Sequence, residues 1–545
     1  LNLMSKDSRV KSKKMQAPVL VVNQNTKRET GRKAQLGNVS AAKAVADVIR
    51  TTLGPRSMLK MLLDPMGGIV LTNDGHAILR EIDVSHPAAK SMLELSRAQD
   101  EEVGDGTTSV IVLSGELLTV AAPFLSDKMH PTVIVRGFHE ALDQSLKIVD
   151  KMAVDVDMND EAKLRELIAS VIGTKFVTRF GEKFVNMAIQ AVKTVSVERP
   201  GRKAEVDIKK YAKVEKIPGG EMSECRVLNG VMFNKDVTHH EMKRKIVKPR
   251  ILLLDCPLEY KKPETAANVE LTQDTDFDAL LKEEEDAIKQ MCADIIAFKP
   301  DVVFTEKGLS DLAQYYFVKN GITAIRRLRK TDNNRIARAT GATIVHRTDE
   351  ICEEDIGTKC GLFEVRKIGD DYFTFLEECD QPKACSIILR GASKDVLMEV
   401  ERNLQDAMRV AKNLMVSPKL VPGGGATEMA IARGLEDYAS NIAGVTRNPY
   451  LAVAKALEVI PRTLLENCGA DVVRQLTALR AKHASKGENQ NLGVNGVTGK
   501  LERMDKIGIW DSYEVKVQTI KTAIESSCML LRIDDIVSGL SRTAQ

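Results

Sequence analysis

The segment from 104 to 109, Gly-Asp-Gly-Thr-Thr-Ser, combines residue types that bind phosphate and a divalent cation. Asp105 lies between two glycines, which let the backbone approach a ligand because they carry no Cβ. Thr107 is a good N-cap for the helix that the apolar spacing after it predicts, and N–H groups at a helix start bind phosphate. An acid beside a phosphate needs a cation between them, and Mg²⁺ suits one or two carboxylates plus phosphate oxygens. A loop that only caps a core helix would have the same sequence, so this segment alone leaves both interpretations open.

Three other glycine-containing loops allow the same two interpretations. Gly54 and Pro55 follow residues 41–53, whose spacing predicts a helix, and would end it as a C′ glycine and a stop. Asn-Asp-Gly at 73–75 follows a strand-like run and is a tight-turn signal that most often marks a hairpin. The three consecutive glycines at 423–425 carry a large entropy cost, which favours close approach of the backbone to a ligand.

The better-known nucleotide motifs are absent from the sequence. It contains no Gly-x-x-x-x-Gly-Lys-Ser/Thr loop and no set of kinase signatures. Gly104 and Gly106 are followed by Ser109 where a dinucleotide-binding loop has a third glycine. An ATP site built from these loops would therefore be of another type.

Composition narrows the class of protein. Lys and Arg number 79 against 76 Asp and Glu, and the net charge of +3 argues against nucleic-acid binding by bulk charge. The basic cluster at 326–330 has no interleaved aromatic residues for stacking on bases.

No apolar run approaches about 20 residues, so we expect no membrane span. The nine cysteines lack a Cys-x-x-Cys pair, which favours a reducing cytoplasm with Cys379 and Cys385 as free thiols. The first fourteen residues form a basic arm to which we assign no function, with Met4 or Met15 as the expected natural start.

The middle of the chain has a different pattern from its ends. Residues 251–255 predict a buried strand, residues 261–273 are polar, and residues 278–296 predict an acidic amphipathic helix. Predicted strands and helices then alternate, as in an α/β domain, over 302–304, 309–320, 324–325, 334–340 and 343–345. The ends are richer in helix. We therefore expect an α/β domain inserted into a helical nucleotide-binding domain whose halves come from both ends of the chain.

The four loops, in this order and at these separations, resemble those of group II chaperonin subunits. They are Leu-Gly-Pro at 53–55, Asn-Asp-Gly at 73–75, Gly-Asp-Gly-Thr-Thr at 104–108 and Val-Pro-Gly-Gly-Gly at 421–425. Four further stretches resemble one paralogue of the eukaryotic cytosolic chaperonin (CCT or TRiC), at 25–28, 254–260, 330–335 and 531–536. The resemblance covers the chain from about Val19 to Ser541.

The resemblance implies a multidomain α+β chaperonin subunit. Its equatorial ATP-binding domain would be 1–156 and 419–545, helical in character. A small intermediate hinge domain would be 157–222 and 382–418. The inserted α/β apical domain, which binds substrate, would be 223–381. The polar stretch 261–273 and the helix after it would build the protrusion that lids the cavity.

The resemblance also assigns roles at a site for ATP and Mg²⁺. Asp105 would hold the metal, and Asp74 and Asp406 would position and activate the attacking water. The residues implied to contact the phosphates are Gly106, Thr107, Thr108 and Ser109. Those implied to lie elsewhere around the nucleotide are Gly54, Gly424 and Gly425, Gly496, Asp511 and Lys516 near the base and ribose, and Lys175 in the nucleotide-sensing loop.

Two of these residues have a plainer interpretation by themselves. The apolar stripe of the predicted helix 394–415 includes Leu404, and Asp406 lies about 200° around the helix from it, off the stripe. From the residues alone, Asp406 is a solvated acid and Lys175 an exposed lysine. The resemblance reverses both interpretations, because domain closure would bring this helix over the γ-phosphate.

The function implied by the resemblance is that of an ATP hydrolase coupled to protein folding. ATP binding and hydrolysis would close a hetero-oligomeric double ring of paralogous subunits around non-native cytosolic proteins, with actin and tubulin as expected clients. We expect a cytoplasmic protein without nucleic-acid or membrane partners. Two other classes use similar loops: a free-standing ATPase or small-molecule kinase, and a scaffold without chemistry. The intact Asp74, Asp105 and Asp406 argue against the scaffold, and the long α/β insertion without catalytic clusters argues against the kinase.

Overall fold

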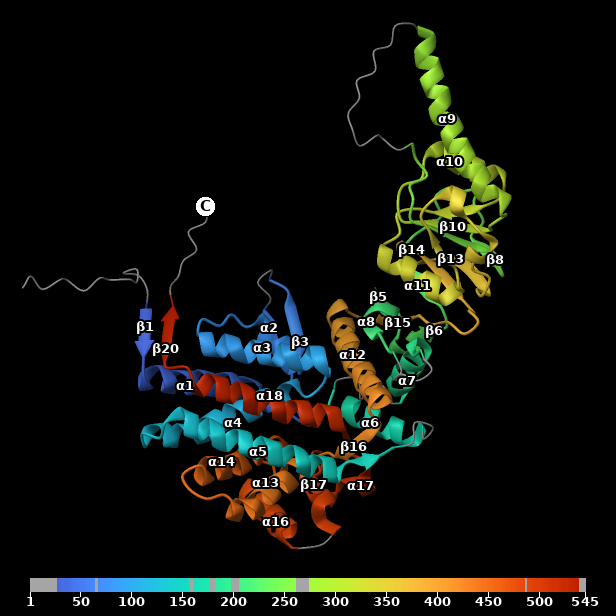
Figure 1. Ribbon diagram of the computed structural model, residues 1–545. Coiled ribbons are helices and arrows are strands. Elements are labelled where there is room, and N and C mark those ends of the chain that lie inside the picture. Colours follow the sequence, from blue (N-terminus) through green and yellow to red (C-terminus); the bar gives the residue numbers. More distant parts are fainter. Residues whose placement is uncertain are drawn as a thin grey trace, which may run out of the picture.

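The computed structural model describes residues 27–63, 67–156, 161–175, 182–197, 205–260, 274–485 and 488–538. These residues form three stacked regions (Figure 1), which we call the helical body, the middle unit and the upper unit. The helical body combines the N-terminal elements up to β4 with those from β16 onward. The basic N-terminal arm and the polar stretch 261–273 lie outside the described residues.

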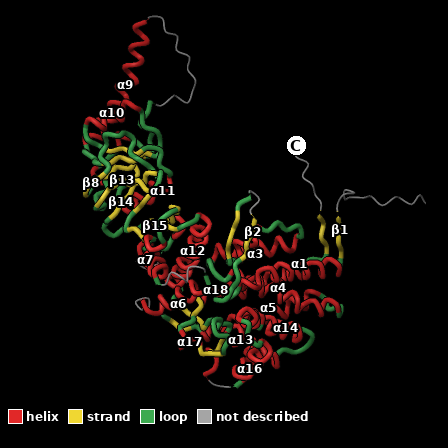
Figure 2. Tube along the Cα trace, turned by 180° about the vertical axis from the view of Figure 1, so that it is seen from behind, coloured by secondary structure: helices red, strands yellow, loops and turns green. Residues whose placement is uncertain are grey.

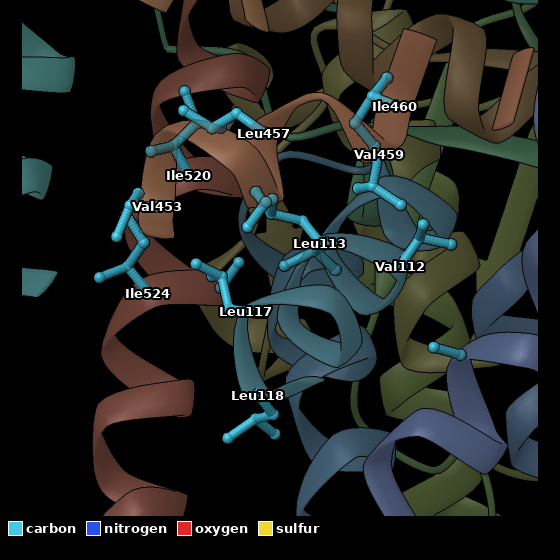
Figure 3. Packing of buried hydrophobic residues seen from close by; sticks show 14 of the residues in the cluster. Val112, Leu113, Leu117, Leu118, Val453, Leu457, Val459, Ile460, Ile520 and Ile524 are labelled. Atoms are coloured by element: carbon cyan, nitrogen blue, oxygen red, sulfur yellow. The ribbon is translucent and has the colours of Figure 1, made fainter. Parts of the chain in front are cut away.

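Helix α4 (Thr107–Ser126) forms the centre of the helical body. It packs against α1 (Arg32–Ile49), α3 (Pro87–Glu102), α14 (Arg447–Leu457) and α18 (Tyr513–Leu531). Figure 3 shows this core, with side chains from both ends of the sequence: Leu113 and Leu117 of α4, Val453 and Leu457 of α14, Ile520 and Ile524 of α18. The body is therefore one hydrophobic core built from two distant parts of the chain.

The composition of α4 corrects one expectation. By length and composition α4 is apolar enough to cross a membrane, with a mean hydropathy of 1.7, so the expectation that no apolar run approaches that length is wrong. The reason for the composition lies in its position. A helix packed on all sides inside a large core is apolar all round.

The remaining helices of the body surround this core. They are α2 (Gly75–Glu81), α5 (Pro131–Met152), α13 (Ala426–Tyr438), α15 (Val459–Cys468), α16 (Val472–Ala484) and the short α17 (Met504–Ile507). Its strands form four small sheets: β1 (Lys27–Thr30) with β20 (Asp535–Ser538), β2 (Lys60–Leu63) with β3 (Ile69–Thr72), β17 (Leu492–Val494) with β18 (Leu501–Arg503), and β4 (Val154–Asp155) with β16 (Lys419–Pro422) and β19 (Trp510–Ser512). The pairing of β1 with β20 places the two ends of the described chain side by side (Figures 1 and 2).

The middle unit is a three-stranded sheet with helices packed against it. The strand order is β5 (Ala212–Pro218), β15 (Cys385–Gly391), β6 (Arg226–Leu228), with β5 and β15 parallel. Its helices are α6 (Glu161–Gly173), α7 (Lys183–Val195), the short α8 (Ile208–Tyr211) and α12 (Lys394–Val416). Helix α12 packs against α6, α7 and β15 and continues into β16 of the body.

The upper unit contains two four-stranded sheets that share one core. The parallel sheet has the order β11 (Thr323–Ile325), β10 (Val302–Thr305), β9 (Ile251–Leu254), β12 (Ile344–Val345). The antiparallel sheet has the order β7 (Val231–Phe233), β14 (Asp371–Glu377), β13 (Leu362–Ile368), β8 (Lys245–Val247). Its helices are α9 (Asp274–Ala297), α10 (Asp311–Lys319) and α11 (Lys330–Thr340). Figure 2 shows how the strands concentrate in this unit while the body is mostly helix.

Several predicted elements are confirmed with shifted ends. The α/β alternation occurs as predicted, although α9 begins at Asp274 and α11 at Lys330, each four residues earlier than the pattern indicated. Helix α1 ends at Ile49 and continues as a 3₁₀ turn (Arg50–Thr52) with Leu53 as its C-cap, so Gly54, at φ 91°, is the C′ residue of the continued helix as predicted. Cys379 and Cys385 are both free and buried, in agreement with the expected reduced thiols.

Candidate functional site

A cavity of about 560 Å³ lies where the helical body meets the middle unit. It is lined by residues from seven separate parts of the body, by residues of α6 and by the residues that follow α6. The predicted site residues that line it are Gly54, Asp105, Gly106, Thr107, Thr108, Ser109, Lys175, Gly424, Gly425, Gly496, Asp511 and Lys516. Asp74 and Asp406 are outside the lining, but each contacts a residue within it. Its volume is in the range of small-ligand sites.

The turn before α4 presents free backbone donors to the cavity. Gly104 and Gly106 have left-handed φ values of 72° and 77°, which glycine adopts without strain. Gly106 is the N-cap of α4, and no side chain caps the first N–H groups. The prediction of Thr107 as the N-cap is therefore wrong: it is the first helical residue, and its hydroxyl donates to Asp74 Oδ1 at 2.9 Å. An uncapped helix start in a cavity binds an anion well.

Asp105 is the acid of this turn. The backbone N–H of Gly106 donates to its Oδ1 at 2.8 Å. Burial raises the pKa of Asp105, the charge of Lys175 opposes the rise, and Asp511 adds to it. Within the part of the chain that the structure describes, no group of three His, Cys, Asp or Glu side chains is placed to hold a metal. A half-buried carboxylate beside an anion site fits Mg²⁺ that takes its other ligands from phosphate and water.

Asp74 links α2 to the start of α4. It is the N-cap of α2, because its Oδ2 accepts from the N–H of Ala77 at 3.1 Å, so the Asn-Asp-Gly segment begins a helix and does not form a hairpin turn. Burial opposes its ionisation, but the charge of Lys175 and the hydrogen bonds from Ala77 and Thr107 outweigh burial. The pKa of Asp74 is therefore below its usual value, and the residue is an anion at neutral pH.

Lys175 and Asp406 face the cavity region from the middle unit. Their Nζ and Oδ2 atoms are 3.0 Å apart, and Asp406 is only 7% exposed, so the interpretation as a solvated acid is wrong. Burial disfavours the charge of Lys175, but Asp406, Asp74 and Asp105 together raise its pKa. Burial raises the pKa of Asp406 to about 8. The negative charges of Asp74 and Asp105 also raise this pKa, and the positive charge of Lys175 lowers it. The raised pKa values of Asp105 and Asp406 indicate that Lys175 does not fully offset the cost of burying their charges, and a bound cation would favour the charged forms.

A second glycine turn forms the far wall. Gly424 and Gly425 have φ values of 61° and 76°, and Gly425 is the N-cap of α13, which also lacks a side-chain cap. A Cβ on Gly424 would be 2.7 Å from the carbonyl oxygen of Val494, so the two segments approach too closely for any larger residue. Two uncapped helix starts thus belong to one cavity.

The floor near Lys516 is a buried ion cluster. Its Nζ pairs with Asp511 Oδ2 at 3.0 Å and with Glu428 Oε1. Burial disfavours the charge of Lys516, but Asp511 and Glu428 raise its pKa. The lysine is therefore a fixed cation whose charge is already balanced.

Comparisons with known proteins assign the fold to a family. The TCP-1/cpn60 chaperonin family model matches residues 45–539. The chain belongs to this chaperonin family. It is 61% identical to T-complex protein 1 subunit gamma of Thalassiosira weissflogii, over 96% of this chain and 98% of that one. It is 60% identical to the proteins of that name from Arabidopsis thaliana and Bos taurus, over 97% and 96% of this chain and 95% of each of theirs. The predicted membership, and the resemblance to the gamma subunit, are confirmed.

This chaperonin also has site residues that the sequence analysis missed. Gln99 is fully buried, and its Nε2 donates to the carbonyl of Asp105 at 3.0 Å and to Thr519 Oγ1 at 3.1 Å. Asn73 lines the cavity, and its Nδ2 donates to the carbonyl of Thr174 at 2.9 Å. Asn73 directly precedes Asp74 in the Asn-Asp-Gly segment, so the sequence could have indicated that Asn73 belongs to the site. Gln99 had none, because its partners are set by the packing of α3 against α18.

Proposed function

We propose that this chaperonin chain binds ATP with Mg²⁺ in the cavity and hydrolyses it as a chaperone subunit. One observation carries the proposal: the uncapped starts of α4 and α13 line the same cavity as Asp105. Helix starts bind phosphate oxygens, and the acid between them suits a hydrated divalent cation. Chaperonin subunits of the TCP-1/cpn60 family are the relatives in which such a site would drive a folding cycle.

Each residue then has a proposed task. Asp105 would hold the metal, and the N–H groups of Gly106 to Ser109 would bind the phosphates, with Gly424 and Gly425 opposite. Gly54, Gly496, Asp511 and Lys516 would surround the ribose and base. Bound Mg²⁺ would neutralise charge that develops on the phosphates.

Two carboxylates would act on the attacking water. Asp74 is an anion held through Thr107, and it would orient the water beside the start of α4. Asp406 would accept the proton of the water, because its pKa of about 8 is close to the working pH of a general base. Lys175 would hold Asp406 in place and contact the nucleotide from the middle unit.

The division into domains is part of the proposal. Residues 1–156 with 419–545 would form the equatorial domain, 157–222 with 382–418 the intermediate domain, and 223–381 the apical domain. The cavity lies between the first two, so the nucleotide would favour the closed arrangement through contacts that the open one lacks. This difference in binding free energy would drive closure.

The proposed setting is a cytoplasmic hetero-oligomeric double ring. The relatives named T-complex protein 1 subunit gamma are subunits by name, which supports assembly with paralogous chains. Non-native proteins, actin and tubulin among them, would be the clients. Native mass spectrometry of the complex from its own cytosol tests the assembly. Two rings of about eight related but distinct subunits are expected, whereas a stable monomer or dimer with ATPase activity would indicate an independent enzyme.

Nucleotide binding tests the site itself. Asp105→Asn keeps the shape of the turn but removes the charge that would hold the metal, so we expect Mg·ATP affinity to fall by about 10-fold or more. Asp127→Asn, an exposed acid at the opposite end of α4, is the matched control and should bind as the wild type does. Equal affinity for both variants, measured by calorimetry, would contradict the proposed metal role.

A further inference from the structure

We infer that helix α12 of the middle unit forms a removable cap on the end of α3, and that Arg409 and Asn413 are its positioning residues. The cap holds the turn that carries Asp105 while the same helix carries Asp406. The docking of α12 would therefore fix the turn that carries Asp105 and bring the carboxylate of Asp406 to the site in a single step.

The last carbonyls of any α-helix have no partner within the helix. Helix α3 ends at Glu102 with Val103 as its C-cap, and side chains from α12 complete it. Arg409 Nη1 donates to the carbonyl of Asp100 at 2.9 Å and pairs with the carboxylate of the same residue. Asn413 Nδ2 donates to the carbonyl of Val103 at 2.8 Å. A carbonyl only accepts, so this contact fixes the orientation of the Asn413 amide.

Gly104 permits this contact. A Cβ built on Gly104 would be 2.1 Å from Cδ of Arg409 and 2.5 Å from its Cβ. The stem of Arg409 therefore lies directly on the backbone of the turn, in space that any other residue would fill. Glycine is needed here for its lack of a side chain as well as for its φ of 72°.

The turn is thus held from two sides. From the body, Gln99 Nε2 donates to the carbonyl of Asp105 at 3.0 Å. From the middle unit, Arg409 contacts Asp100 in the last turn of α3, and Asn413 contacts Val103 directly before the turn. In Figure 1, α12 descends from the middle unit beside the end of α3. Only the second support is lost if α12 leaves.

The spacing along α12 joins this cap to the proposed chemistry. Asp406 lies three residues before Arg409, which places both on the same side of the helix, about one turn apart. A displacement of α12 that breaks the contacts with Asp100 and Val103 therefore also withdraws Asp406. The effect on ATP hydrolysis rests on the proposed function, whereas the effect on the turn does not.

The test uses the full-length chain in its native assembly, and hydrogen exchange of its peptides as the readout. Asn413→Asp is isosteric but cannot donate to Val103, and Arg409→Met keeps the apolar stem without the donors. In nucleotide-free protein, each should speed amide exchange at 103–107 by about 3- to 10-fold, the factor expected for one lost hydrogen bond. Lys412→Ala is the matched control, since Lys412 lies on α12 without a hydrogen bond or ion pair to any residue that the structure describes. It should change nothing.

Hydrolysis supplies the second readout. Single-turnover rates at saturating ATP should fall by a similar factor in Asn413→Asp, with nucleotide affinity within about 3-fold of wild type. Unchanged exchange at 103–107 in both variants overturns the cap. An equal loss of affinity and rate makes the residues general supports of the site and overturns their role as positioning residues. If the wild type binds no ATP, the proposed function is wrong. The amide exchange rates at 103–107 would still test whether α12 caps α3.

Discussion

The wall of the cavity in the helical body is held by backbone geometry, whereas the wall in the middle unit is held by side-chain pairs. In the body, left-handed glycines and two helix starts are fixed by a core that extends through α4. In the middle unit, Lys175 and Asp406 form an ion pair. Among the described residues, the hydrogen bonds that cross between the walls include those of Asn73, Arg409 and Asn413.

This difference suggests a division of labour. A rigid wall with free N–H groups can bind phosphate in every state of the protein. The polar contacts of the middle-unit wall can break and re-form as that wall moves, because each contributes only about 1 kcal/mol. Changes in the body wall should then alter affinity and stability, and changes in the middle-unit wall should alter the rate of hydrolysis.

The largest expected effect is the loss of hydrolysis in Asp406→Asn. Removing a positioned general base lowers the rate by about 10²- to 10⁴-fold. Nucleotide affinity should remain within about 3-fold of wild type, because Asp406 does not line the cavity. Single-turnover hydrolysis and equilibrium binding measure the two quantities. Glu401→Gln, which alters an acid on the same helix that pairs with Lys216, is the control. A wild-type rate of hydrolysis in Asp406→Asn would contradict the proposal that the middle-unit wall controls hydrolysis.

The titration of Asp406 should also affect how the stability of the folded protein depends on pH. The pKa of Asp406 is about 8 in the folded protein, through burial and the nearby Asp74 and Asp105, against about 3.9 when unfolded. The folded state therefore holds the proton more tightly, and this stability is full below about pH 4 and is lost as the pH rises through about 8. Asp406→Asn should gain stability over the wild type across that window, by at most about 6 kcal/mol.

Thermal unfolding of both nucleotide-free proteins between pH 5 and 9 measures this difference. Titrating groups far from Asp406 contribute equally to both proteins and cancel in the comparison, whereas Lys175, which is coupled to Asp406, changes with it. The difference in midpoint should rise toward pH 8 and then level off. A difference that stays constant with pH would mean that Lys175 keeps Asp406 ionised, and the residue would then be a fixed anion like Asp74.

A smaller effect is expected from Gly106→Ala in the body wall. The new Cβ would be 2.9 Å from Thr519 Oγ1 and would force a left-handed φ on alanine. We expect a loss of about 1–3 kcal/mol in stability and weaker nucleotide binding, with hydrolysis of bound ATP little changed. Gly444→Ala, at φ 86° with open space around it, isolates the backbone term in the same body. Calorimetric affinity and thermal midpoints of both variants separate the two contributions, and a selective loss of hydrolysis in Gly106→Ala would contradict the comparison.

The sequence predicted the rigid wall better than the movable one. The glycine turns at 104–106 and 423–425 are visible because their conformation is required locally. The burial of Asp406 was not visible, since its partner Lys175 lies 231 residues away. The same reason explains the error at Thr107, whose hydroxyl bonds to Asp74 and leaves the N-cap position to Gly106. The family resemblance placed these residues at one site, and the structure supplied their pairing.

The smallest effect is expected at Asn73, where the two walls meet on the other rim. Its Nδ2 donates to the carbonyl of Thr174 at 2.9 Å, directly before Lys175, and to Ser57 Oγ at 3.1 Å. Asn73→Ala should cost about 1 kcal/mol, speed amide exchange around 174–175 and slow hydrolysis by about 2- to 5-fold. Asn320→Ala removes an exposed amide that donates to Tyr316 within one helix of the upper unit, and it should leave all three quantities unchanged. If Asn73→Ala changed only the nucleotide affinity, Asn73 would belong functionally to the wall in the helical body. The hydrogen bonds that couple the two walls would then be those made by α12.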